Sequence, residues 1–180
     1  MTLTTPRLWL LPLPTRIMRE RLIHDDFTAE LDGPQGPLQV HYPPQWPGAV
    51  LPLFASRLHT QPEHGDPWSY TAVRREDGRA IGQLSGKGGP DAEGRLEIGY
   101  GFNAEVWGHG YATEAVGAMV QAFRQRPEVQ QIWAQTATHN RASARVLEKL
   151  GFIQTGQSFD LEDGPLLVWT LPYTRLSATS

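Results

Sequence analysis

Two glycines one residue apart, Gly108 and Gly110, stand where an apolar strand pattern gives way to an amphipathic helix pattern. Glycine adopts positive φ without strain, so this pair predicts a tight turn between the two elements. A turn that feeds the start of a helix leaves several backbone N–H groups pointing at one place. The helix dipole adds roughly half a positive charge there, which suits a phosphate or pyrophosphate. Taken alone, the two glycines predict either an anion site or no more than a tight connection.

Apolar periodicity beside this turn predicts a regular second half of the chain. From Ala112 onward, apolar or small side chains recur at helical spacing, and Pro127 stops that helix. Asn140 has the side chain of a helix cap, and Gly151 supplies the left-handed residue that ends the following helix. Four strands are expected around these helices, over residues 95–102, 132–138, 152–159 and 166–171.

The start of the chain has weaker patterns. A short strand is expected over residues 8–11, and Thr15 can cap a helix over residues 16–31. Frequent prolines and glycines predict an irregular stretch over residues 32–67, interrupted by a short helix over residues 51–58. This stretch is expected on the substrate side of the molecule.

A hairpin follows the irregular stretch. Residues 68–74 and 79–86 read as two strands, and Asp77-Gly78 between them suits the positive φ angles of a tight turn. A run of strands followed by alternating strands and helices predicts an α+β fold with a mixed sheet. With 180 residues, the chain is expected to be one domain over residues 1–180.

Charge and composition exclude several classes of protein. The net charge of −3 argues against nucleic-acid binding, because proteins that neutralise phosphodiester chains are usually basic. The absence of cysteine excludes disulfides, thiolate catalysis and cysteine-ligated metals. No apolar run reaches the length of about 18 residues that a membrane span needs, and the histidines lack metal-ligand spacing. We therefore expect a cytoplasmic protein with no membrane partner and no bound metal.

Other glycine-rich patterns are typical of nucleotide-binding sites, and they are alternatives to an anion-binding turn at Gly108 and Gly110. Gly99-Tyr100-Gly101-Phe102-Asn103-Ala104 formally matches the dinucleotide pattern G-x-G-x-x-A. Its context disagrees, because Gly108 and Gly110 prevent a helix from beginning at Ala104, and no acidic residue follows where a ribose hydroxyl would need it. The ATP-binding pattern G-x-x-x-x-G-K-[ST] does not occur. A nucleotide-binding module is therefore disfavoured.

Two segments together resemble the coenzyme A signature of the GNAT N-acetyltransferases. They are Trp107-Gly108-His109-Gly110-Tyr111-Ala112-Thr113-Glu114-Ala115 and, later, Asn140-Arg141-Ala142-Ser143-Ala144-Arg145-Val146-Leu147-Glu148-Lys149-Leu150-Gly151-Phe152. The nearest branch includes the RimJ/RimL-like N-terminal acetyltransferases of ribosomal proteins. Trp107 stands where most of the family has glutamine or arginine, a variation known in that branch. The resemblance implies a mixed, mostly antiparallel sheet flanked by helices.

The resemblance also implies a coenzyme-binding core over residues 95–152 and indicates which residues hold acetyl-CoA. The pyrophosphate would meet the turn and the following helix start, and the pantetheine arm would meet the end of the preceding strand. Asn140 would contact the coenzyme, with Arg145 near its phosphate end. The other implied coenzyme-binding residues are Tyr100, Gly101, Phe102, Trp107, Gly108, His109, Gly110, Tyr111, Ala112 and Thr113.

Acetyl transfer to an amine needs a neutral amine, a stabilised oxyanion and a protonated leaving thiolate. By resemblance, Ser143 would protonate the thiolate, although a serine in a first helical turn often only satisfies backbone groups. A backbone N–H near Tyr100 or Gly101 would meet the oxyanion. Glu97 is the preferred general base, while Glu162 and a water path remain open.

The sequence therefore predicts an acetyl-CoA-dependent N-acetyltransferase that acts by direct attack in a ternary complex, with no covalent enzyme intermediate. Its acceptor would be a primary amine, on a peptide N-terminus or on a small molecule. Two alternatives remain: transfer of a longer acyl group, and an acetyl-CoA sensor or scaffold without turnover. The sequence also leaves open whether two copies form a homodimer that completes the pocket.

Overall fold

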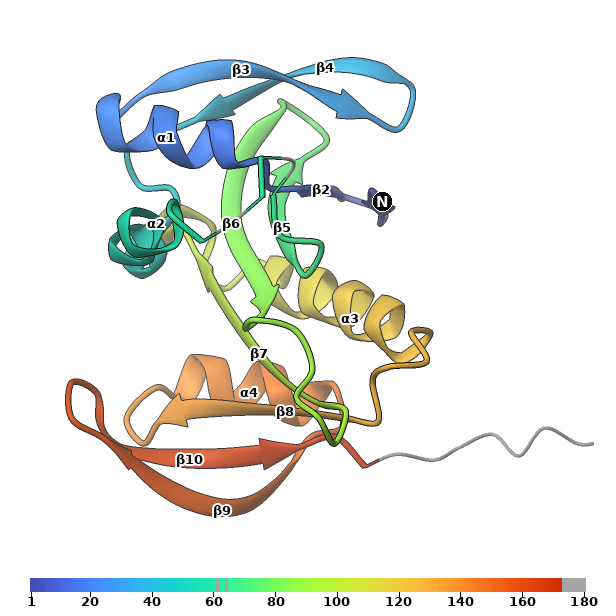
Figure 1. Cartoon of the computed structure of the whole chain (residues 1–180), viewed down its shortest axis with the longest axis vertical. Coiled ribbons are helices and arrows are strands. Elements are labelled where there is room, and N and C mark those ends of the chain that lie inside the picture. Colours follow the sequence, from blue (N-terminus) through green and yellow to red (C-terminus); the bar gives the residue numbers. More distant parts are fainter. Residues whose placement is uncertain (61, 64, 173–180) are drawn as a thin grey trace, which may run out of the picture.

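The computed structural model describes residues 1–60, 62–63 and 65–172, and within them ten strands form one mixed sheet (Figure 1). The last eight residues of the domain expected over residues 1–180 lie outside the described part. The strands are β1 (Leu3–Thr4), β2 (Leu8–Pro12), β3 (Phe27–Gly33), β4 (Gly36–Tyr42), β5 (Ser69–Arg74), β6 (Arg79–Gly86), β7 (Arg95–Phe102), β8 (Gln131–Ala137), β9 (Ile153–Asp160) and β10 (Gly164–Thr170). The α-helices are α1 (Thr15–Ile23), α2 (Leu51–Arg57), α3 (Tyr111–Arg124) and α4 (Arg141–Lys149).

The sheet is mostly antiparallel. Its strands follow the order β1-β2-β5-β6-β7-β8-β10-β9, and β4 joins β6 through a single parallel pair. The other parallel neighbours are β7 and β8, which α3 connects. Figure 1 shows the β3–β4 hairpin and the β9–β10 hairpin at opposite ends of the long axis. The expected α+β architecture with a mixed, mostly antiparallel sheet is confirmed.

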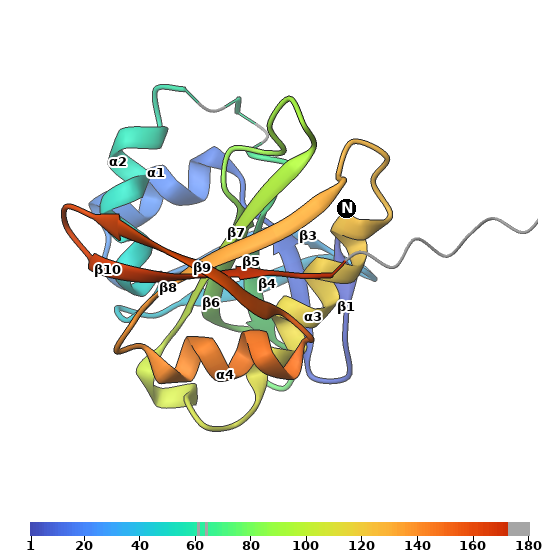
Figure 2. The same ribbon diagram turned by 90° about the horizontal axis from the view of Figure 1, so that it is seen from below.

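Alternating side chains send the sheet's apolar residues to two separate cores. On one face, Leu96 and Ile98 of β7 pack with Val116 and Met119 of α3 and with Leu147 of α4. The opposite face is covered by α1, α2 and the β3–β4 hairpin, which pack on the first half of the sheet. Figure 2 shows α1 and α2 on the other side of the strands from α4.

The helix expected over residues 16–31 is wrong in its second half. The helix α1 ends at Ile23, and β3 begins at Phe27. Along β3 the partly or fully buried residues Phe27, Ala29 and Leu31 alternate with exposed ones. That alternation has the period of a half-buried strand, and it competes with the imperfect helical stripe in the same residues.

The irregular stretch expected over residues 32–67 is also corrected. It contains β4, which pairs with β3 in an antiparallel hairpin closed between Gly33 and Gly36. The strand includes Pro37, which the sequence reading took as a breaker. Such a residue is tolerated near the start of a strand. The short helix expected within this stretch is present as α2.

Two surveys of the described residues bear on other classes of protein. None of the described helices combines the length and apolar character that crossing a bilayer requires. Within the same residues, no group of three or more acidic or histidine side chains gathers in a way that would hold a metal ion.

The parallel pair of β7 and β8 parts partway along β7. Their register runs from Arg95↔Gln131 to Ile98↔Ala134 and ends there. Beyond Ile98, β7 continues to Phe102 and stays paired only with β6. In the described part of the chain, residues 99–102 therefore have no strand on their other edge. A sheet edge of this kind exposes backbone hydrogen-bonding groups.

Candidate active site

The two-glycine turn lies directly before α3. Gly108 and Gly110 have φ of 78° and 79°, a left-handed conformation that side-chain-bearing residues rarely adopt. The first helical hydrogen bond runs from the Glu114 N–H to the Gly110 carbonyl at 3.1 Å. The N–H groups of Tyr111, Ala112 and Thr113 precede that bond, so the helix itself does not use them. A Cβ added at Gly108 would meet no atom within 4 Å, so the turn faces open space.

An N-terminal arginine holds this turn in place. The Arg7 guanidinium donates to the His109 carbonyl at 2.9 Å and lies over the Tyr111 ring at 4.2 Å. It also pairs with Glu114 in the first turn of α3, where Nε lies 2.6 Å from Oε2. The Thr5 hydroxyl donates to the same carboxylate at 2.6 Å. Segments more than a hundred residues apart in the chain are joined here.

Glu114 is ionised in this arrangement. Burial alone would raise its pKa, but hydrogen bonds from Thr5 and Arg7 outweigh that effect and hold the pKa below the ordinary value. The carboxylate near the turn is therefore neutralised by Arg7 and leaves the anion-binding character of the helix start intact.

Register decides which backbone groups of β7 are free. The Lys87 N–H donates to the Glu97 carbonyl at 2.7 Å, and the Asn103 N–H donates to the Ile81 carbonyl at 2.9 Å. Antiparallel pairs alternate between bonded and non-bonded, so Gly99 and Gly101 also direct their N–H groups toward β6. The intervening Tyr100 and Phe102 direct theirs to the opposite edge, where β8 has parted. Of the two oxyanion donors considered from the sequence, this geometry favours the N–H of Tyr100 over that of Gly101.

The Trp107 side chain hydrogen-bonds to one of the β7 backbone groups that β8 leaves unpaired. Its indole Nε1 donates to the Phe102 carbonyl at 2.7 Å, while the side chain is 67% exposed. The Phe102 carbonyl is therefore already used, although its N–H remains directed to the open edge. The His109 ring folds back on the turn, with Nδ1 2.9 Å from the Trp107 carbonyl oxygen.

The start of α4 lies against β7. Asn140 caps this helix by accepting from the Ser143 N–H at 3.1 Å, as its position in the sequence suggested. The Tyr100 hydroxyl donates to the Ser143 carbonyl at 3.1 Å, and burial raises the pKa of Tyr100, so that hydroxyl keeps its proton. Ser143 is thus brought to the strand whose edge is open. Arg145 is exposed and lies about 200° around the helix axis from Ser143. The structure therefore does not bring these two side chains together.

Glu97 lies on the other face of the sheet from Tyr100. Successive residues of a strand point to opposite faces, and Leu96 and Ile98 point into the α3–α4 core. The Glu97 carboxylate accepts from the Lys87 ammonium at 2.5 Å. Two hydrogen bonds from the N–H groups of Asp163 and Glu162 hold the pKa of Asp160 below its usual range, and the charge of Lys87 adds to this effect. The β9–β10 turn therefore lies within electrostatic reach of Lys87.

The face that carries Glu97 is open along β7. A Cβ built at Gly101 would meet nothing within 4 Å, whereas one at Gly99 would meet the Cε atom of Lys87 at 2.8 Å. A hollow of about 300 Å³ lies between the end of α2 and the β6–β7 loop, where Gly88 follows Lys87. It is lined by Arg57, Thr60, Pro62, Asp66, Pro67 and Gly88.

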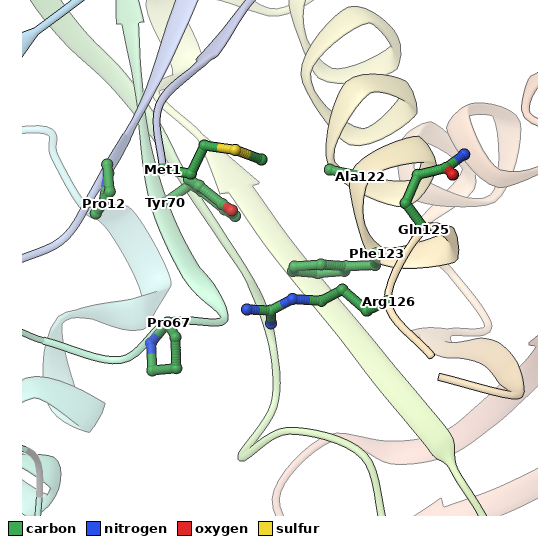
Figure 3. Close-up of a pocket in the computed structure, with 8 residues that line it drawn as sticks. All are labelled: Met1, Pro12, Pro67, Tyr70, Ala122, Phe123, Gln125 and Arg126. Atoms are coloured by element: carbon green, nitrogen blue, oxygen red, sulfur yellow. The ribbon is translucent and has the colours of Figure 1, made fainter. Parts of the chain in front are cut away.

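A second cavity, of about 210 Å³, lies away from the turn (Figure 3). The view shows the Arg126 guanidinium beside the Phe123 ring, with Tyr70 and Met1 opposite. None of the residues that line it belongs to the set expected from the sequence.

The expected residues thus form two groups. The turn, the free edge of β7 and the start of α4 gather on one side, and Glu97 faces the other. The sequence reading missed Arg7 and Lys87, which hold the turn and the candidate base. No local pattern signals either contact, because Arg7 and Glu114 are 107 positions apart and the Lys87 pair depends on strand register.

Sequence comparison identifies relatives of this chain. A family model described as an acetyltransferase (GNAT) domain matches residues 25–153. An uncharacterized N-acetyltransferase of Bacillus subtilis (strain 168), YjdG, is 32% identical over 118 residues, which is 63% of this chain and 70% of that protein.

Solved structures share the fold over nearly the whole chain. A putative GNAT-family acetyltransferase from Bordetella pertussis superposes with a TM-score of 0.67 at 17% identity and covers 96% of this chain and 99% of its own. RimL, a ribosomal L7/L12 α-N-protein acetyltransferase solved with coenzyme A, has a TM-score of 0.65 at 13% identity and covers 94% and 97%. At these identities the likeness concerns the fold.

Proposed function

The chain belongs to the GNAT acetyltransferase family, and from that premise we propose that its acceptor is the α-amino group of a peptide. It is an N-acetyltransferase that moves the acetyl group of acetyl-CoA to an amine. The proposal concerns the residues that do this and the class of amine. The observation that carries it is the free edge of β7 at Tyr100, which lies between the start of α4 and the Glu97 face.

We assign the coenzyme to the side of the sheet edge that carries the turn. The N–H groups of Tyr111, Ala112 and Thr113 lie at the positive end of the α3 dipole, and Gly108 has open space where a side chain would stand. The sequence candidates Gly108 to Gly110, Trp107 and Asn140 belong to the same surface. When bound there, acetyl-CoA supplies a thioester-activated acetyl group.

Residues of this chain then provide three services. The Tyr100 N–H, directed to the open edge, would stabilise the oxyanion of the acetyl carbonyl. Ser143, which adjoins Tyr100, would donate a proton to the leaving thiolate. Glu97 would accept the proton of the attacking amine from the opposite face. The amine and the thioester thus approach the strand edge from different sides, as direct attack in a ternary complex requires.

Acid–base energetics favour an α-amine over a lysine-type amine. An α-amine with a pKa of about 8 costs only about 1.4 kcal/mol to neutralise at pH 7. A lysine-type ammonium with a pKa of about 10.4 costs about 4.6 kcal/mol. A single carboxylate that is already paired with Lys87 is better matched to the smaller of these costs.

The shape and charge of the acceptor face support the same choice. The hollow of about 300 Å³ between α2 and the β6–β7 loop is the size of a small ligand or a few peptide residues. Its lining includes one acidic and one basic side chain, Asp66 and Arg57. A polycationic acceptor would be held better by several carboxylates. We therefore rank polyamines and aminoglycoside-like amines second.

Two alternatives to this function are a sensor and a transferase for a longer acyl group. An acetyl-CoA sensor would bind the coenzyme without turnover. Transfer of a longer acyl group would need room near Phe102, whose ring packs on Gly82 and closes that part of the strand.

The proposal includes a single domain over residues 1–180 and a cytoplasmic location, which suits a chain without cysteine. All its residues lie on one chain, so it does not need a homodimer.

The test is thiol release from acetyl-CoA with matched acceptors. One peptide would carry a free α-amine and no lysine. Its partner would have a blocked α-amine and one lysine, and spermidine would represent polyamines. We expect turnover with the first peptide and much less with the other two. Preference for spermidine or for the lysine peptide would overturn the α-amine assignment, and binding without thiol release from any amine would favour the sensor.

A further inference from the structure

Lys87 occupies the position where an acceptor amine would have to stand. Its ammonium lies 2.5 Å from the Glu97 carboxylate, the candidate base. Its aliphatic chain crosses the face of β7 over Gly99, where the Cε atom fills the space of the missing side chain. The next residue on that face, Gly101, is uncovered. A primary amine of the chain itself thus lies over the face of β7 next to Gly99, one residue before Tyr100, whose N–H points to the edge away from β6.

Lysine is rare in this protein, so the placement is specific. The chain has two lysines, Lys87 and Lys149, against fourteen arginines. Lys149 lies in the last turn of α4 and is exposed. An arginine at position 87 would make the same ion pair with Glu97, but only lysine carries an amine that can accept an acetyl group.

We propose that the chain acetylates its own Lys87, an inference that rests on the proposed acetyl-transfer site. The ammonium of Lys87 gives a proton to Glu97, and the neutral Nζ forms a bond to the acetyl carbon of acetyl-CoA. The nitrogen then loses its second proton, which passes through Ser143 or water to the coenzyme A thiolate as the carbon–sulfur bond breaks, so Ser143 keeps its own proton count and Glu97 releases its proton to solvent. The products are an amide at Lys87 and free coenzyme A, and no other reactant is needed.

Proximity offsets the poor ionisation state of a lysine. A free lysine ammonium is only about 0.04% neutral at pH 7. Holding the nucleophile beside its base and the strand edge replaces a bimolecular encounter with an intramolecular one. The Lys87 side chain is 44% exposed and has a flexible four-carbon stem, so Nζ can move from Glu97 toward the edge. Each chain would react once.

Acetylation would also change the site. An acetylated lysine has lost its charge, so it no longer pairs with Glu97. The carboxylate would then be free to accept a proton from an incoming amine. The modified chain is therefore expected to turn over a peptide acceptor faster than the unmodified chain.

The experiment incubates the purified full chain with acetyl-CoA and no acceptor, followed by intact-mass measurement and peptide mapping. We expect one acetyl group per chain, located on Lys87, formed at a rate that does not depend on protein concentration. Lys87→Arg should remove the modification, Glu97→Gln should slow it by at least about tenfold as expected for loss of a general base, and Lys149→Arg should leave it unchanged.

A mixing control separates self-acetylation from transfer between copies. Isotopically heavy Gly110→Asp chains, which should not bind the coenzyme, are mixed with light wild-type chains. Acetylation of the light chains only supports the proposal. Acetyl groups on Lys149, on the heavy chains, or nowhere would overturn it. If peptide acceptors are acetylated while Lys87 stays free, this inference fails and the proposed function stands. If calorimetry finds no acetyl-CoA binding, the proposed function itself fails.

Discussion

Two observations describe the surroundings of Glu97, the proposed general base. It lies on the face of β7 away from the coenzyme side, and its carboxylate is held by Lys87 at 2.5 Å. Glu162 is the other acidic residue considered from the sequence. It sits in the exposed β9–β10 turn, where its N–H donates to the Asp160 carboxylate at 2.8 Å. The structure therefore separates the two candidates by position, since Glu97 lies on β7 and Glu162 lies in the β9–β10 turn.

Glu97→Gln should lower kcat/KM for a peptide α-amine by about tenfold at pH 7, because the amide cannot accept the proton. The deficit should shrink as the pH rises toward the α-amine pKa of about 8, since neutral amine becomes abundant without a base. The pH profile of kcat/KM, measured beside Glu162→Gln, checks this. Equal losses in the two variants, or a loss that does not vary with pH, would contradict the assignment.

At the residue scale, roles that depend on neighbouring positions could be predicted from the sequence, whereas contacts between distant segments could not. The cap at Asn140 and the turn glycines follow from residue type, because each performs its role within a few positions. The contacts Arg7–Glu114 and Lys87–Glu97 depend on how strands and helices meet in space. The spacing of residues along the chain does not show which distant segments come into contact, so these two contacts could not be predicted from the sequence.

At the scale of elements, α4 depends on its cap. Asn140→Ala removes the acceptor of the Ser143 N–H and should cost about 1 kcal/mol of the free energy of unfolding. Asn140→Asp restores a cap acceptor and should retain the stability of the wild type. Urea unfolding of the three proteins measures the difference. If both variants lose the same stability, the side chain acts by something other than capping.

The link between the N-terminal segment and α3 should be sensitive to pH. Hydrogen bonds hold the Glu114 pKa below its ordinary value of 4.5 in the folded state. A carboxylate with a depressed folded-state pKa stabilises the fold above the unfolded-state value, and this contribution is lost as the pH falls through the folded-state pKa. The wild type should therefore exceed Glu114→Gln in unfolding free energy at pH 7, and the gap should narrow below pH 4.5. A gap that is constant with pH would contradict this link.

Elements with one dominant period were predictable, and α3 and β7 lie where the sequence places them. The segment over residues 16–31 was not predictable, because its apolar residues are compatible both with a helical stripe and with the alternation of a strand. Pairing with β4 decides in favour of β3, and β4 itself begins with a glycine and a proline, residue types that predicted an irregular stretch. Tertiary pairing overrides local preference in such segments.

At the scale of the molecule, function depends on the parting of two strands. The sheet is continuous from β1 to β9, yet β7 and β8 separate after Ile98 and leave backbone groups unpaired between α3 and α4. The glycine pattern predicted the turn to which we assign the coenzyme. The open strand edge and the division into a coenzyme side and an acceptor face became visible only with the register.

The most direct test of this account is a calorimetric titration with acetyl-CoA. It compares the wild type with Gly110→Asp and with Gly151→Asp. Both glycines have left-handed φ, 79° and 86°, so the two variants carry similar backbone strain, but only Gly110 lies in the turn. An aspartate at Gly110 adds negative charge at the start of α3, and its Cβ would lie 3.5 Å from the Arg7 Nη2 atom that helps to hold the turn.

The account predicts one bound acetyl-CoA per chain for the wild type and for Gly151→Asp. Binding by Gly110→Asp should be weaker by roughly a hundredfold, about 2.8 kcal/mol. Thermal unfolding of each variant should first establish that it is folded. Equal affinity in all three proteins, or no binding by the wild type, would mean that the two-glycine turn is only a connection between β7 and α3.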